Sequence, residues 1–143
     1  MAGLGDITHS HLDIDLKISS FGRAVAQAHQ TGELDRDALT ASLLELKEEV
    51  LRHAEQEEEI LMPKLIAMLG ASHRDILDIR SQHQDLGQRL EAIHTELDSA
   101  SCSTRELKER FEAFRVNFEL HTQTEANVLD GTASMLFPGA GAG

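Results

Sequence analysis

Apolar residues recur at alternating spacings of three and four in four long segments of this sequence, so each segment has one apolar face as an α-helix. The segments cover about residues 5–30, 35–69, 72–99 and 103–131, and short polar loops join them. This pattern predicts an all-α protein, an up-down-up-down antiparallel four-helix bundle with the apolar faces inside. We assign residues 1–131 to this domain and residues 132–143, which are rich in glycine and alanine, to a flexible C-terminal tail.

Residues that start and stop helices stand at the expected helix ends. Gly70 can close the second helix in a left-handed conformation, and Asp130–Gly131 is the expected end of the fourth. The candidate N-terminal caps are Asp35 or Asp37 for the second helix, Ser72 for the third, and Ser103 with Glu106 as a capping box for the fourth.

Six residues with metal-binding side chains interrupt the apolar faces of the four helices. They are His11, His53, Glu57, His83, His121 and Glu125. Two carboxylates inside a bundle are costly unless a positive charge neutralises them, because burial removes their hydration. Burial alone would also raise the pKa values of both glutamates. A pair of metal ions supplies the missing charge, and we interpret the six residues as one dinuclear site.

The six residues occur in the same order in both halves of the chain. A single histidine precedes a His-x-x-x-Glu pair twice: His11 before His53 and Glu57, then His83 before His121 and Glu125. Because residues four apart lie on one helix face, two matching helical hairpins predict a site with pseudo-twofold symmetry. Imidazole and carboxylate ligands suit first-row transition metals, iron or manganese first. If both glutamates bridge, each ion holds two imidazoles and keeps an open position for dioxygen, peroxide or nitric oxide.

Composition excludes several other classes of partner. The formal charge of -12 argues against nucleic acid and against an anionic membrane surface. No apolar stretch approaches the roughly 20 residues of a membrane span, and the N-terminus lacks the pattern of a signal peptide. Cys102 is the single cysteine, so no internal disulfide can form, and a reducing cytoplasm is the expected compartment. Cys102 itself is either an idle thiol or a redox group.

Two side chains near His11 leave alternatives open. His9 would replace His11 in the site if the helix register shifted by two residues. Asp15, one turn after His11, is either a solvated residue, an extra ligand or a partner that orients an imidazole. Three other histidines lie off the apolar face or too far along a helix: His29, His73 and His94. The Glu-x-x-His sequence at residues 91–94 occurs once, whereas ferritin-type bundles need two copies.

The sequence resembles the hemerythrin-like family, the HHE cation-binding domains. The resemblance spans about residues 4–131 and is carried by His-x-x-x-Glu-Glu-x-x-Leu-Met-Pro at residues 53–63 and by His-x-x-x-Glu at residues 121–125. It implies a four-helix bundle with a non-haem di-iron centre, in which oxygen and carboxylates bridge two iron ions. It also implies that the six histidines and glutamates named above are the metal ligands.

The sequence departs from the oxygen-carrying hemerythrins at two places. Those proteins have another histidine one turn after the third-helix histidine, where this chain has Gly87. They also have an aspartate five residues after the fourth-helix histidine, where this chain has Ala126 and places Glu125 one position earlier. Fewer imidazoles leave more open coordination, which favours turnover of peroxide, dioxygen or nitric oxide over reversible oxygen carriage.

The sequence therefore predicts a non-haem di-iron protein that binds or turns over oxygen species. One alternative is a reversible carrier or sensor of oxygen or iron. Another is a bundle that its tail, with the apolar residues Met135-Leu136-Phe137-Pro138, recruits to a larger assembly through a protein partner. Association into a homodimer is also left open.

Overall fold

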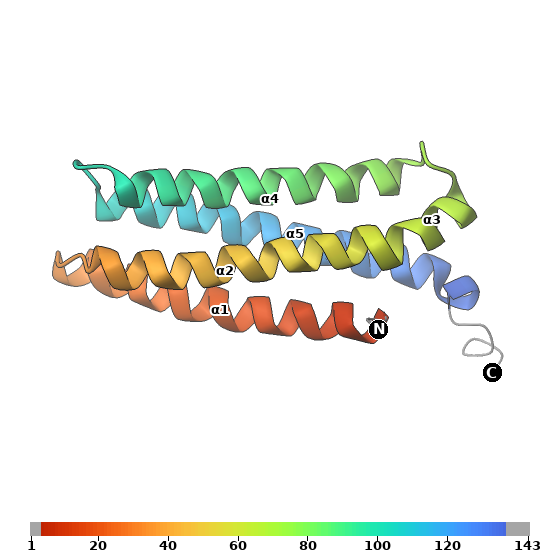
Figure 1. Cartoon of the computed structure of the whole chain (residues 1–143), viewed down its shortest axis with the longest axis horizontal. Helices are drawn as coiled ribbons and strands as arrows, with labels where there is room; N and C mark the ends of the chain where they lie inside the picture. Colours follow the sequence, from red (N-terminus) through yellow and green to blue (C-terminus); the bar gives the residue numbers. More distant parts are fainter. Residues whose placement is uncertain (1–3, 137–143) are drawn as a thin grey trace.

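The computed structural model describes residues 4–136, with side chains described from residue 11 to residue 132, and this part of the chain is all-helical. Its elements are α1 (Leu4–Thr31), α2 (Arg36–Gln56), the π-helical turn η1 (Glu57–Leu61), α3 (Met62–Leu69), α4 (Arg74–Asp98) and α5 (Thr104–Leu136). Figure 1 shows the long helices side by side, with α1 against α2 and α5, and α4 against the same two helices. Over these residues, no helix combines the length and the apolar character needed to cross a bilayer.

The buried side chains form two apolar clusters on the predicted helix faces. The larger cluster includes Ile14, Ile18, Phe21 and Val25, Leu39, Leu43, Leu46 and Val50, Leu86, Leu90, Ile93 and Leu97, and Leu107, Phe111, Phe114 and Phe118. The smaller cluster contains Leu61, Met62, Leu65, Ile76, Ile79 and Val128. Along α2, α4 and α5, the predicted metal-binding residues fall between the two clusters, so a polar layer divides the core.

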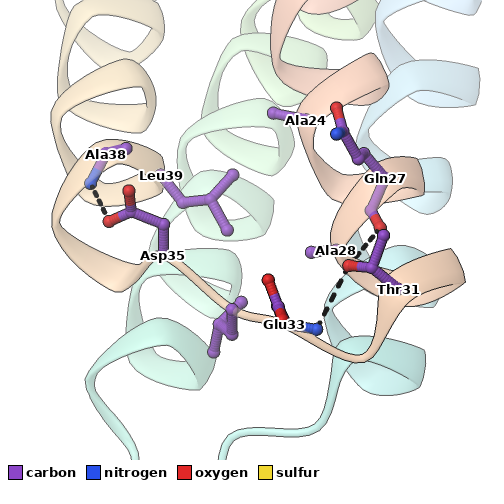
Figure 2. Close-up of a pocket in the computed structure, with 9 residues that line it drawn as sticks. Ala24, Gln27, Ala28, Thr31, Glu33, Asp35, Ala38 and Leu39 are labelled. Carbon is purple, nitrogen blue, oxygen red and sulfur yellow. Dashed lines mark hydrogen bonds between the residues drawn. The ribbon is translucent and has the colours of Figure 1, made fainter.

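The turn between α1 and α2 closes the end of the bundle on the left of Figure 1. Gly32 has a φ of 75°, a left-handed conformation that glycine tolerates. The Thr31 hydroxyl donates to the Gln27 carbonyl at 3.0 Å, and the Asp35 carboxylate accepts from the Ala38 amide at 3.1 Å (Figure 2). Asp35 is therefore the cap of α2. The hollow drawn in Figure 2 is about 440 Å³, and none of the six predicted metal-binding residues lines it.

The caps of α3 and α4 confirm one prediction and correct another. Gly70 ends α3 with a φ of 94°, as expected. The N-terminal cap of α4 is His73, and the prediction of Ser72 is wrong. The Nδ1 atom of His73 accepts from the Asp75 amide at 3.1 Å, the bond that a serine hydroxyl would have made. An unprotonated imidazole nitrogen can cap a helix in the same way as a hydroxyl oxygen.

The predicted capping box of α5 is half present. The Ser103 hydroxyl accepts from the Glu106 amide at 3.3 Å, as expected. The Ser103 amide, however, donates to Glu96 at 2.9 Å and not to the side chain of Glu106. Glu96 comes from the end of α4, so the carboxylate that completes this cap belongs to the preceding helix.

The π-helical turn η1 follows from the position of Pro63. A proline inside a helix has no amide hydrogen, and its ring clashes with the carbonyl four residues earlier, here that of Glu59. The chain accommodates this by one wider turn, in which the Met62 amide donates to the Glu57 carbonyl five residues back. The extra residue rotates the apolar face. As a result Leu61 is fully buried, whereas Ile60, which continues the three-and-four spacing after His53 and Glu57 and would be the buried residue of a regular helix, is half-buried.

The last helix is longer than predicted. The expected end at Asp130–Gly131 is wrong, because α5 continues to Leu136. Gly131 does not have a positive φ, so it stays in the helix and does not close it. Thr132 is buried and its hydroxyl donates to the Val128 carbonyl at 2.8 Å, which extends the inner face by one turn. Of the apolar tail segment, Phe137 and Pro138 lie outside the described residues, and the division at residue 132 stays a prediction.

Candidate metal centre

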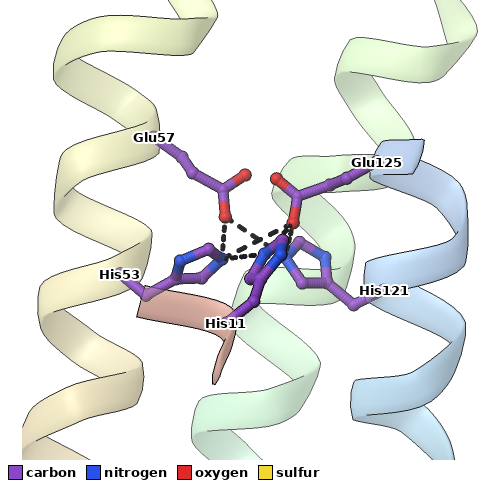
Figure 3. A group of neighbouring side chains, drawn as sticks. All are labelled: His11, His53, Glu57, His121 and Glu125. Atoms are coloured by element: carbon purple, nitrogen blue, oxygen red, sulfur yellow. Dashed lines mark hydrogen bonds and ion pairs between the residues drawn. The ribbon is translucent and has the colours of Figure 1, made fainter. Parts of the chain in front are cut away.

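Five of the six predicted residues converge at one point between the helices. His11 comes from α1, His53 from the last turn of α2, Glu57 from the start of η1, and His121 and Glu125 from α5. One nitrogen or oxygen atom from each lies within 4.8 Å of all the others. Figure 3 shows the two carboxylates pointing toward one another with the imidazoles beside them.

Each carboxylate lies among three imidazoles, and one oxygen makes all the contacts. Glu125 Oε1 is 2.8 Å from His11 Nε2, 2.9 Å from His121 Nε2 and 3.5 Å from His53 Nε2. Glu57 Oε1 is 3.3 Å from His121 Nε2, 3.4 Å from His83 Nε2 and in close contact with His53 Nε2. All four histidines therefore turn the same nitrogen, Nε2, toward the carboxylates.

The four imidazole rings form two pairs. The ring centroids of His11 and His53 are 4.4 Å apart, and those of His83 and His121 are 4.8 Å apart. His53 and His83, one from each pair, are 6.2 Å apart. His83 lies outside the tight group of five but contacts Glu57 from α4. Each pair combines the two histidines of one helical hairpin, so the pairs follow the two halves in which the six residues recur along the chain.

Burial leaves several polar atoms of this cluster without partners. Glu57 and His121 have no exposed surface, and His53 and Glu125 are 1% exposed. The buried atoms without a hydrogen-bond partner include His53 Nδ1, Glu57 Oε2, His83 Nε2 and Glu125 Oε2. Such atoms are costly in a protein interior, whereas a cation among them would satisfy both the oxygens and the nitrogens. The cluster fits a metal site.

Gln82 fixes the proton of one imidazole in the cluster. His121 Nδ1 lies 3.0 Å from Gln82 Oε1, and because an amide oxygen can only accept, Nδ1 is the donor. The Gln82 amide then donates to the Thr124 hydroxyl at 3.0 Å. With its proton on Nδ1, a neutral His121 turns the lone pair of Nε2 toward two carboxylate oxygens, where a cation belongs. The sequence analysis did not identify Gln82 as a partner of the site. The one signal for that role is that Gln82 directly precedes His83.

The residues that the sequence left open lie at the edge of the centre or away from it. Asp15 is exposed, which favours the solvated alternative. The side chain of His9 lies outside the described residues. Three histidines have other contacts: His29 with Thr104, His73 as the cap of α4, and His94 with Lys47. Glu91 is exposed and pairs with Lys47, so the Glu-x-x-His sequence takes no part in the cluster.

The electrostatics of the cluster correct one expectation. Burial lowers the pKa of His11 to about 4, with a further contribution from His53, and burial also lowers the pKa of His121. Burial would raise the pKa of Glu57, but the contacts from His121, His53 and His83 outweigh it and hold that pKa well below its usual value. The expectation of a raised pKa is therefore wrong for Glu57. A charged Glu57 beside neutral imidazoles is the protonation state that binds a metal, and any proton that an imidazole Nε2 shares with Glu57 in the metal-free protein would be released on binding.

We expect the metal-free protein to lose stability as the pH falls below about 6.5. Between the unfolded pKa of His11, 6.5, and its folded pKa, about 4, the unfolded chain binds more protons, so acid favours unfolding. The lowered pKa of His121 acts in the same direction. Urea unfolding of chelator-treated protein between pH 4 and pH 8 measures the effect, and His11→Gln should reduce it. A free energy of unfolding that is constant over this range would contradict the assignment.

The family comparison agrees with this geometry. A family model described as the hemerythrin HHE cation binding domain matches residues 3–133. The chain belongs to the hemerythrin family. Comparisons with curated proteins and with solved structures returned no match. The predicted family is thus confirmed, and membership of a cation-binding hemerythrin family, together with the His/Glu cluster, indicates a metal-binding domain for which iron is the expected metal.

Proposed function

We propose that this hemerythrin-family protein holds two iron ions and that the centre binds and turns over peroxide, dioxygen or nitric oxide. His11 and His53 would hold one ion, His83 and His121 the other, and both ions would share the two glutamates. The observation that carries the proposal is the pairing of the rings around two carboxylates that each contact three imidazoles. A di-iron centre, when bound, supplies electrons to a small oxygen species. The expected up-down-up-down antiparallel arrangement is part of the proposal, and the chain colours in Figure 1 support it.

The surrounding residues would orient the ligands and keep water away from them. The two apolar clusters cover the polar layer on both sides along α2, α4 and α5. Low polarity around the layer strengthens the attraction between a cation and the carboxylates of Glu57 and Glu125. The bond from His121 to Gln82 would hold that imidazole in the tautomer that presents Nε2.

Metal stoichiometry tests the dinuclear part of the proposal. We expect about two iron ions per chain after anaerobic loading, because six donors in two sets suit two ions of this class. Metal analysis by plasma mass spectrometry and Mössbauer spectroscopy of the loaded protein measure the number and the coupling of the ions. A single ion per chain, or a site that retains zinc and no iron, would overturn the proposal.

A substitution at Gly87 tests whether the centre turns over peroxide or carries oxygen reversibly. A Cβ atom at Gly87 would meet nothing within 4 Å, so a side chain can start from this position without a clash at Cβ, and we expect Gly87→His to be tolerated. The new imidazole, one turn after His83, would occupy an open position and slow peroxide turnover by about tenfold, equivalent to roughly 1.4 kcal/mol. Peroxide consumption by the iron-loaded variants measures it. Gly131→His is the control, because Gly131 is also exposed and helical with no atom within 4 Å. A wild-type protein that oxygenates reversibly and consumes no peroxide would favour the carrier or sensor function.

The remaining predictions concern compartment and partners. Cys102 is half-buried, and burial raises the pKa of its thiol, which favours an idle thiol over a redox group. A cytoplasmic location, a homodimer and a protein partner for the C-terminal tail stay predictions from the sequence.

A further inference from the structure

A groove of about 670 Å³ runs between α2 and α4 and reaches the candidate centre. Its walls include Val50, Leu51 and Ala54 from α2, and His83, Gly87 and Leu90 from α4. The apolar side chains and the small residues among them make a surface that suits uncharged molecules of low polarity.

His83 forms the boundary between this groove and the carboxylates. Its side chain is 10% exposed and lines the groove, while its Nε2 atom lies 3.4 Å from Glu57 Oε1. A molecule in the groove is therefore separated from Glu57 by a single imidazole ring. His83 Nε2 is buried without a hydrogen-bond partner, so the nitrogen between the groove and Glu57 is free to bind a ligand.

Gly87 keeps the groove open at its His83 end. Glycine is unfavourable in the middle of a helix, and two structural reasons for it are absent here. Gly87 does not have a positive φ, and a Cβ atom there would meet nothing within 4 Å. At Gly22, by contrast, a Cβ atom would come within 2.9 Å of Phe111. Since Gly87 lines the groove, a side chain at this position would project into that space.

We propose that the groove between α2 and α4 is a binding and access site for small uncharged gases such as dioxygen and nitric oxide, and that Gly87 sets its width. Binding in the groove does not depend on the metal. The route from the groove to the centre rests on the proposed function. The competing route passes His11 on the other side of the cluster, where the side chain is 20% exposed.

Xenon tests the binding part on the full chain prepared without paramagnetic metal. In NMR titrations we expect xenon to shift the methyl signals of Val50, Ala54 and Leu90. Gly87→Leu should reduce these shifts by about fivefold or more, because leucine fills the space that xenon occupies. Gly131→Leu, the same change at an exposed helical glycine outside the groove, should leave them unchanged. Absent shifts in the wild type, or equal shifts in both variants, would overturn the proposal.

Nitric oxide tests the access route on the iron-loaded protein. The association rate at the ferrous centre, followed by stopped-flow absorbance, should fall about tenfold or more in Gly87→Leu and stay at the wild-type value in Gly131→Leu. Iron content and melting temperature are measured for each variant to show that the centre is intact. Equal rates would mean that gases pass His11 and that the route is wrong. If the protein fails to load iron but the xenon shifts are present, the proposed di-iron function is wrong and the proposed gas-binding groove still stands.

Discussion

Glu57→Gln should lower the iron affinity of this protein by on the order of 100-fold or more. Residues that only support metal ligands contribute up to about 100-fold, and Glu57 is itself a proposed ligand. Glu57 Oε1 contacts three imidazoles, and its charge is one of two that would offset the cations. The amide keeps the size of the side chain and removes the charge and one metal-binding oxygen. Iron content after dialysis against a competing chelator measures the loss.

The control for this variant lies two residues away in the same π-helical turn. Glu59 is exposed, so Glu59→Gln makes the same chemical change without touching the cluster. It should retain the wild-type iron content. Equal iron loss in both variants would show that the net charge of the protein, and not the position of Glu57, governs binding.

Loading the metal-free protein with ferrous iron should raise its melting temperature by roughly 15–30 °C. An ion present at about 1,000 times its dissociation constant adds about 4 kcal/mol, two ions about twice that, and each kcal/mol moves the transition by about 2–4 °C in chains near this size. The physical reason is that the folded state alone brings the carboxylates and imidazoles together. Scanning calorimetry with and without iron measures the shift.

Magnesium at the same concentration is the control for this experiment. Magnesium prefers oxygen ligands, so a site with four imidazoles should bind it poorly and the melting temperature should change little. Identical melting of the iron-loaded and metal-free proteins would contradict a metal site in the polar layer.

The helical architecture and the position of the candidate site follow from spacing along the chain. Alternating intervals of three and four place Ile14 and Phe21, or Leu43 and Leu46, on one side of a helix whatever surrounds it, and these residues are buried. The same intervals place His53 and Glu57 in that series, so they are buried together. Periodicity is a local property, and it predicts which residues meet in the core without any knowledge of the loops.

Features that depend on neighbouring helices could not be predicted in this way. Glu96 replaces a local partner at the cap of α5, and Gln82 supports an imidazole on another helix. The pKa of Glu57 is the clearest case. The sequence shows that this carboxylate is buried, but the number of imidazoles around its oxygen decides the direction of the shift, and that number is a property of the assembled bundle.

The Pro63 effect lies between these two cases. The sequence shows a proline within the second helix, and a local rule says that the regular hydrogen bonding must break there. Whether the chain ends the helix, bends it or widens one turn depends on how the next residues pack. Here Leu61, Met62 and Leu65 join the smaller apolar cluster, and the wider turn is the solution that buries them.

The polar layer that divides the core has a consequence for how this protein unfolds. Small single domains usually unfold cooperatively because one continuous apolar interior couples all their parts. In this chain a layer of carboxylate and imidazole groups separates the two apolar clusters along α2, α4 and α5. The attraction that holds this layer together depends on whether a metal ion lies among those groups. Cooperativity is therefore not fixed by the sequence alone. We expect the occupancy of the layer to set it, so that the metal-loaded chain unfolds as one unit and the metal-free chain as two loosely coupled ones.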